Sequence, residues 1–173
     1  MPKILENVRE RVMEEAKRQV VENGYASMTI RSVAKACGLG VGTVYNYFPS
    51  KDMLIASFML ENWQQMLAEI RKEAEGTPEE VLRKAYTELK RFADTYRMLF
   101  TDSTALKVFA AASGEWHSQL IAQFASVLQP VCEKSGRTEE AFFSEFVAES
   151  LLTWTLAGTS FEELYGVLRF LFE

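Results

Sequence analysis

The sequence predicts an all-α protein of about nine helices, because apolar residues recur at helical spacing and no stretch alternates as a strand would. Capping Ser or Thr and helix-ending Gly separate the helical segments. Of the 173 residues, 48% are hydrophobic and 25% are charged, which is typical of a globular chain. This length suffices for a buried core without disulfides, and two Cys with one His are too few for a zinc site.

The first predicted helix carries Leu5, Val8, Val12, Ala16 and Val20 on one face. It is expected to end at Asn23-Gly24, because Gly adopts the left-handed backbone conformation that follows many helices. The stretch from 25 to 28 is then a short connection.

Two short helical segments follow, with a very short turn between them. The first begins at Thr29, whose hydroxyl can accept a backbone N–H, and ends at Gly38. The second runs from Val41 to Phe48 and ends before Pro49. Two short helices joined by a turn that contains Gly have the sequence form of a helix-turn-helix.

Longer helices fill the rest of the chain. Ser50 is predicted to cap a helix that reaches about Ala74. Capping boxes, at Thr77 with Glu80 and at Ser160 with Glu163, are predicted to start two more. The other predicted helices cover 98–112, 115–134, where Pro130 predicts a kink, and 138–157.

The second short helix has an unusual surface for a purely structural element. Only Val44 and Phe48, four residues apart, are expected to face inward. A Gly such as Gly42 lets the backbone approach a phosphate closely, and Tyr hydroxyls can donate to phosphate oxygens. Asn46 can pair with an adenine edge, and small side chains such as Thr43 can touch a thymine methyl.

From residue 24 to residue 54 the sequence resembles the DNA-binding domain of the TetR family of bacterial transcription regulators. The residues that carry the resemblance are Gly24, Tyr25, Thr29, Ile30, Val33, Ala34, Gly38, Val41, Gly42, Tyr45, Tyr47, Phe48, Ser50 and Lys51. The resemblance implies that residues 40–47 enter the major groove of DNA. One departure is Gly40, where Ser is frequent in the family.

Pattern and resemblance together predict a set of DNA-binding residues. They are Thr29, Arg31, Gly40, Val41, Gly42, Thr43, Tyr45, Asn46, Tyr47 and Lys51. The resemblance further implies two domains, a helix-turn-helix DNA-binding domain over 1–53 and a ligand-binding and dimerisation domain over 54–173.

Aromatic residues of the second domain could line an effector cavity, although each could equally be ordinary core. The predicted ligand-binding residues are Phe92, Tyr96, Phe109, Trp116, Phe124 and Trp154. In the family, the last two helices form a four-helix interface with a second copy. The predicted interface residues here are Phe143, Val147, Leu151, Leu164, Leu168 and Leu171.

The expected function is that of a homodimeric transcriptional regulator, a repressor that binds a palindromic DNA operator and is released by a small hydrophobic or aromatic ligand. The alternative is an all-α ligand- or protein-binding module whose helix-turn-helix no longer binds DNA. An enzyme is disfavoured, because no paired carboxylates or nucleophile–base set stands out. No cofactor and no metal site are expected.

The net charge of −5 argues against a nucleic-acid binder until it is divided along the chain. Residues 1–53 hold eight Lys or Arg against six Asp or Glu, so the negative charge lies in the rest. The stretch from Tyr25 to Lys51 contains no acid. With no signal peptide and no apolar run long enough for a membrane span, the expected location is the cytoplasm, with no membrane partner.

Overall fold

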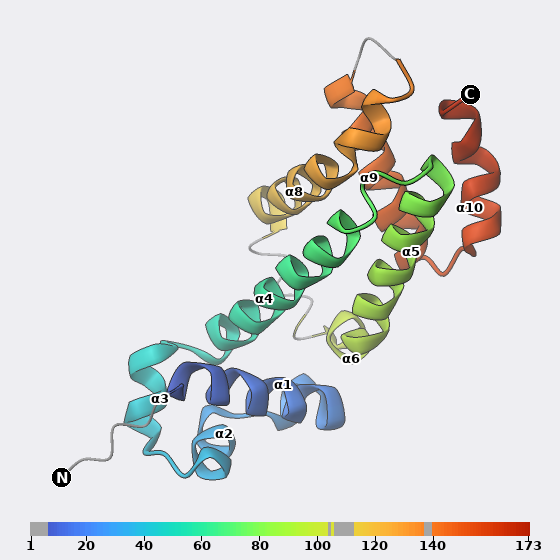
Figure 1. Ribbon diagram of the computed structural model, residues 1–173. Helices are drawn as coiled ribbons and strands as arrows, with labels where there is room; N and C mark the ends of the chain where they lie inside the picture. The colour runs from blue at the N-terminus through green and yellow to red at the C-terminus, as the bar shows by residue number, and fades with distance from the viewer. Residues whose placement is uncertain (1–6, 104, 106–112, 137–139) are drawn as a thin grey trace. The chain divides into compact units, whose positions relative to one another are not determined.

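The computed structural model describes residues 7–103, 105, 113–136 and 140–173. These residues form helices joined by turns, and no strand occurs among them, so the predicted all-α class is confirmed (Figure 1). The helices are α1 (Val8–Ser27), α2 (Ile30–Cys37), α3 (Val41–Tyr47), α4 (Lys51–Arg71), α5 (Pro78–Thr95), α6 (Arg97–Thr101), α8 (Ser113–Glu133), α9 (Glu140–Leu156), α10 (Phe161–Leu168) and the 3-10 helix η1 (Arg169–Leu171).

The chain divides into two compact units that interleave in sequence. One comprises Met1–Asn62 and Thr95–Ala110, and the other comprises Trp63–Asp94 and Ala111–Glu173. The helix α4 runs without interruption from the first unit into the second. The predicted boundary between a DNA-binding domain and a ligand-binding domain at residues 53 and 54 stays a prediction. The compact first unit extends beyond it and includes the first half of α4 and all of α6.

In the first unit α2 packs on α1 and on α3, and the core also holds buried residues from the start of α4. The helix α6 lies against α1, and Tyr96, just before α6, stacks on Phe58 of α4 with ring centroids 6.1 Å apart. Fully buried side chains in this core include Val12, Ala16, Met28, Val33, Val44, Leu54, Ile55 and Leu99.

The break in α1 confirms the predicted end of the first helix. Gly24 has φ +80° and ψ 171°, outside the helical region, so the regular helix stops there and a turn continues to Ser27. A Cβ at Gly24 would lie 3.4 Å from Cε of Met98 on α6, which is ordinary van der Waals contact, so packing alone does not require Gly here. The backbone conformation, with its positive φ, is what requires the predicted Gly at this position.

The core of the second unit forms among the end of α4, α5, α8, α9 and α10, with α9 packed along α8. Trp63 belongs to this core, and the rings of Phe92 and Phe124 meet it edge to face at centroid distances of 5.8 and 6.2 Å. Edge-to-face pairs at such distances add stability beyond the burial of apolar area.

Three predicted helix starts are confirmed by hydrogen bonds. Ser50 Oγ accepts from the Met53 backbone N–H at 3.1 Å, and Thr77 with Glu80 makes the predicted reciprocal pair. Ser160 Oγ accepts from the Glu163 N–H at 3.3 Å, while the Glu163 carboxylate accepts from the Ser160 N–H at 3.1 Å.

Other predicted boundaries need adjustment. The helix α4 ends at Arg71, a little before the predicted Ala74, and α8 begins at Ser113, before Gly114 rather than after it. Of the stretch predicted as helical over 98–112, the structure describes α6, which ends at Thr101, and residues 102, 103 and 105. The predicted helix start at Thr138 lies outside the described residues. None of the described helices combines the length and hydropathy needed to cross a membrane.

Candidate nucleic-acid interface

The helix-turn-helix begins with a well-formed cap on α2. Thr29 Oγ1 accepts from the Ser32 backbone N–H at 3.0 Å, and Ser32 Oγ accepts from the Thr29 N–H at 3.0 Å. Thr29 was predicted as the N-cap, and the structure confirms this role. The Thr29 side chain is exposed, and a hydroxyl that accepts one hydrogen bond still has its own O–H to donate to a phosphate.

The turn between α2 and α3 is closed by Gly38. It has φ +67°, and its N–H donates to the Lys35 carbonyl at 3.1 Å, while the Leu39 N–H donates to the Ala34 carbonyl at 2.8 Å. These are the hydrogen bonds of a left-handed helix end, which Gly forms without steric strain. The chain therefore reverses quickly enough for α3 to start at Val41.

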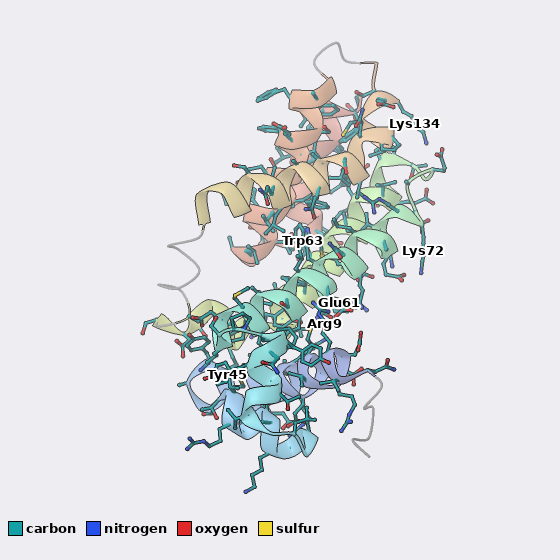
Figure 2. All side chains as sticks on the ribbon, turned by 90° about the vertical axis from the view of Figure 1, so that its left-hand side faces the viewer. Arg9, Tyr45, Glu61, Trp63, Lys72 and Lys134 are labelled. Carbon is teal, nitrogen blue, oxygen red and sulfur yellow. The ribbon has the colours of Figure 1, made fainter. Side chains whose placement is uncertain are left out.

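The helix α3 is attached to its unit by two side chains. Val44 is 0% exposed and Phe48, which follows the helix, is 2% exposed, so both predicted inward anchors are confirmed. The rest of the helix presents polar groups: Tyr45 (labelled in Figure 2) and Tyr47 are 49% and 47% exposed, and Asn46 is also exposed. Predicted residues Val41 and Thr43 are half-buried beside them.

The two Gly residues of this segment are not required by the packing of the free protein. A Cβ at Gly42 would meet nothing within 4 Å, and one at Gly40 would meet only Thr43 Oγ1 at 3.7 Å. Both residues are exposed, and neither has a positive φ. Their small size leaves the backbone at the start of α3 accessible from outside, which fits close approach by a partner molecule.

The predicted cations lie in two different settings. Arg31 is exposed on α2. Lys51, the first residue of α4, is half-buried, and its Nζ donates to the Tyr25 backbone carbonyl and lies 3.8 Å from the centroid of the Tyr25 ring. Burial lowers the pKa of Lys51, and the nearby carboxylates of Asp52 and Asp102 oppose that shift.

Sequence reasoning missed the role of Tyr25, which it placed in a short connection. Tyr25 is 7% exposed, and its hydroxyl donates to Asp52 Oδ1 at 2.6 Å. Burial, followed by this hydrogen bond, raises the pKa of Tyr25 to about 12. The sequence marked Tyr25 only as one of the residues that carry the family resemblance, and this does not identify its partners.

The predicted ligand-binding residues are not brought together. Phe92 and Phe124 flank Trp63 in the second unit, whereas Tyr96 belongs to the first unit and stacks on Phe58. Trp154 is 53% exposed on α9. Phe109 lies outside the described residues, as does the side chain of Trp116. The six residues therefore do not form one site in the described part of the chain.

The predicted dimer residues are mostly part of the chain's own core. Val147 and Leu151 are 0% exposed, and Phe143, Leu164 and Leu168 are also buried. Only Leu171 is half-buried. The interface residues stay a prediction: Val147 and Leu151 leave no exposed surface for a second copy, whereas Leu164, Leu168 and Leu171 line a surface groove.

Other apolar residues of the same helices are exposed instead. We call this set the α9–α10 face, and its members are Phe142, Phe146, Trp154 and Leu156 from α9 and Val167 and Phe170 from α10 and η1. The helices α9 and α10 lie side by side (Figure 1), and a shallow groove of about 320 Å³ runs between them. The groove is lined by Phe146, Ser150, Trp154, Thr159, Glu163, Leu164, Val167, Leu168 and Leu171.

The two Cys residues make no disulfide. Cys37 is half-buried, with Sγ donating to the Arg11 carbonyl at 3.6 Å, and Cys132 is buried in the second unit. Burial raises the pKa of both thiols. Within the described residues, no group of three or more His, Cys, Asp or Glu side chains is arranged to hold a metal ion.

Fold and site together define an all-α helix-turn-helix protein. Residues 12–58 match the family model described as "Bacterial regulatory proteins, tetR family". The helix-turn-helix region of the chain therefore matches the TetR family.

Named relatives agree with this assignment. The chain is 34% identical over 68 residues to the HTH-type transcriptional regulator UidR of Escherichia coli K12, a match that covers 39% of this chain and 35% of UidR. It is 31% identical over 107 residues to the HTH-type transcriptional repressor KstR of Mycolicibacterium smegmatis, covering 61% of this chain and 52% of KstR. The chain thus spans about a third and about half of these relatives, which are named as regulators and not as enzymes.

The fold is shared over almost the entire chain. The solved structure of GusR from Salmonella enterica superposes with a TM-score of 0.67, covering 98% of this chain and 96% of GusR at 18% sequence identity. At that identity the likeness establishes the fold alone. The helices after residue 58, which the family model does not cover, share the fold of GusR.

Proposed function

We propose that the chain is a homodimeric transcriptional repressor of the bacterial cytoplasm that binds a palindromic DNA operator and leaves it when a small ligand binds. The observation that carries the proposal is the surface of α3. Val44 and Phe48 hold the helix on its unit, and Tyr45, Asn46 and Tyr47 remain exposed. A short helix with buried anchors and an outward row of hydrogen-bonding groups suits insertion into the major groove.

The exposed groups divide into two proposed roles. Thr29, Arg31, Tyr45, Tyr47 and Lys51 contact phosphates, which fix the position of the protein on the duplex. The residues Val41, Thr43 and Asn46 face base edges, and the bare backbone of Gly40 and Gly42 allows α3 to come close. The absence of acids from Tyr25 to Lys51 supports this division, because no carboxylate on that stretch repels the phosphates.

The α9–α10 face supports a dimer. Phe142 and Val167 are each 69% exposed, and a monomer rarely leaves so many large apolar side chains of neighbouring helices in water. A second copy presents the same face, so a two-fold axis would pair α9 and α10 with their counterparts and fill the groove between them. Two copies of α3, the proposed recognition helix, related by that axis would match a palindromic operator.

The proposed effector site lies in the second unit, around Trp63. The indole Nε1–H of Trp63 is buried and has no acceptor among the described residues. Phe92 and Phe124 bracket the same ring. A small apolar or aromatic ligand with a hydrogen-bond acceptor would satisfy the N–H, which is costly to leave unpaired.

The helix α4 supports a route from effector to DNA. It carries Lys51 at its first turn in one compact unit and Trp63 in the other. A ligand that binds better to one position of α4 than to another shifts the population toward that position. The resulting change in the separation of the two recognition helices would release the operator. The name of KstR as a repressor supports this direction of regulation.

The test is selection of binding sites from random duplex DNA with the purified chain, followed by fluorescence anisotropy on the enriched sequence at several salt concentrations. We expect an enriched palindrome whose affinity falls steeply as salt rises, because counterions are released from the phosphates. Tyr47→Phe and Arg31→Ala should each weaken binding while the fold is kept. A chain that enriches no sequence and binds no DNA at low salt would instead be the all-α binding module.

A further inference from the structure

The ammonium of Lys51 is held inside its own chain before any DNA arrives. Its Nζ donates to the backbone carbonyl of Tyr25 and lies 3.8 Å from the centroid of the Tyr25 ring. A cation over an aromatic face is attracted by the ring quadrupole, and the attraction grows when the pair is partly desolvated. The Lys51 side chain is half-buried, and the carbonyl and the ring of Tyr25 both hold its ammonium.

The Tyr25 ring is itself fixed. Only 7% of Tyr25 is exposed, and its hydroxyl donates to Asp52 Oδ1 at 2.6 Å. Asp52 follows Lys51 in the first turn of α4, so the same turn that carries the ammonium also anchors the ring that holds it. Tyr25 lies just after the break at Gly24, and it therefore connects the end of α1 to the start of α4.

This arrangement leaves the ammonium able to bind a further partner. An ammonium has three N–H donors, and the Tyr25 carbonyl takes one of them. The position at the amino end of a long helix adds the positive end of the helix dipole to the charge of Lys51. Asp52 and Asp102 are the nearby acids, and the Asp52 oxygen already accepts from Tyr25.

We propose that Tyr25 is a positioning residue for the phosphate contact of Lys51, holding the ammonium in place without touching DNA. This inference rests on the proposed DNA binding. A free Lys side chain loses its rotamer freedom when it closes on a phosphate, at a cost of about 0.5–1.5 kcal/mol per side chain. Because Tyr25 already orders Lys51, the side chain loses its rotamer freedom when the protein folds. The contact with a phosphate therefore forms at a smaller entropic cost.

The test is a double-mutant cycle on the full chain with its selected operator, using Tyr25→Leu, Lys51→Met and the double variant. With Lys51 present, Tyr25→Leu should weaken binding about twofold to tenfold, which is the ordering cost expressed as a ratio of dissociation constants. In the Lys51→Met background, Tyr25→Leu should have no further effect. Lys51→Met should lower the slope of log K against log salt by about one, whereas Tyr25→Leu should leave that slope unchanged.

Two results would overturn the inference. Equal loss in both backgrounds means that Tyr25 only supports the fold, and tighter binding by Tyr25→Leu means that Tyr25 competes with DNA for the ammonium. Should Tyr25→Leu fail to fold, Tyr25→Phe keeps the ring and loses the bond to Asp52, and absence of coupling between Tyr25→Phe and Lys51→Met then counts against the proposal. A wild-type chain that binds no DNA contradicts the proposed function itself, which separates the two failures.

Discussion

Val44 and Asn46 lie two residues apart on α3 and have opposite environments. Val44 is 0% exposed, so truncation to Ala removes buried methyl groups and leaves a cavity. We expect Val44→Ala to lower the free energy of unfolding by on the order of 2 kcal/mol, measured by urea denaturation. The matched control is Val21→Ala on α1, where the Val is 39% exposed and the change should be within about 0.5 kcal/mol. Equal effects at both sites would contradict the assignment of Val44 as an anchor.

Asn46 is exposed, so its replacement should affect recognition and leave stability unchanged. A bidentate Asn contact with an adenine contributes about 1–3 kcal/mol of discrimination. Asn46→Ala should therefore weaken operator binding by about 5-fold to 150-fold and relax the preference at one A·T position, while binding to unrelated DNA stays the same. Gln65→Ala, at an exposed amide on α4, is the control. A uniform loss on all sequences would make Asn46 a phosphate contact instead.

The individual residues also show where sequence reasoning succeeds. Val44 and Phe48 could be predicted as anchors because they are apolar residues four apart in a short segment that is otherwise rich in polar groups and Gly. Val147 and Leu151 could not be assigned to core or interface, because α9 is apolar on more than one face. Its buried residues and its exposed Phe142 and Trp154 are chemically alike. Only the packing of α9 on α8 decides which face is internal.

At the scale of the element, α10 should lose stability in acid through its capping box. Hydrogen bonds from the side chain and backbone N–H of Ser160 hold the pKa of Glu163 below its ordinary value of 4.5. Because the folded pKa is the lower one, the contribution is complete above about pH 4.5 and is lost as the pH falls through the folded pKa. Glu163→Gln should therefore show a smaller loss of stability than wild type between neutral pH and pH 3, by urea denaturation.

Two variants of Ser160 serve as the matched pair for this measurement. Ser160→Ala removes the hydroxyl donor and should also reduce the dependence on pH, whereas Ser160→Thr keeps a hydroxyl and should behave as wild type. If Glu163→Gln and wild type lose stability in parallel, the capping box does not contribute to acid sensitivity.

The elements also show that helix starts could be predicted from the sequence, whereas contacts between distant helices could not. The start signals at Thr29, Ser50, Thr77 and Ser160 are local hydrogen bonds, and each could be predicted from residues within one turn. The helix α6 packs on α1 even though more than two complete helices separate them in the sequence. That contact joins residues far apart in the sequence, and no local pattern predicts it. The same limit hid the contact between Tyr25 and Lys51.

At the scale of the whole molecule, the proposed dimer depends on the α9–α10 face. Val167 is 69% exposed and lines the groove between the two helices, so Val167→Glu should leave the monomer folded. In a two-fold dimer, the substitution places an unpaired carboxylate on both copies within an apolar contact, where desolvation of charge is costly. We expect the dimer dissociation constant to rise at least tenfold, measured by sedimentation equilibrium.

The same substitution separates dimerisation from DNA contact. Val167→Glu should weaken binding to the complete palindrome and leave binding to a single half-site unchanged, because α3 is untouched and only the link between two recognition helices is lost. Ala122→Glu, on the exposed surface of α8, adds the same charge away from the face and should remain dimeric. A Val167→Glu chain that remains dimeric and binds the palindrome as tightly as wild type would place the interface elsewhere. The exposed aromatic residues of α9 would then need a different partner.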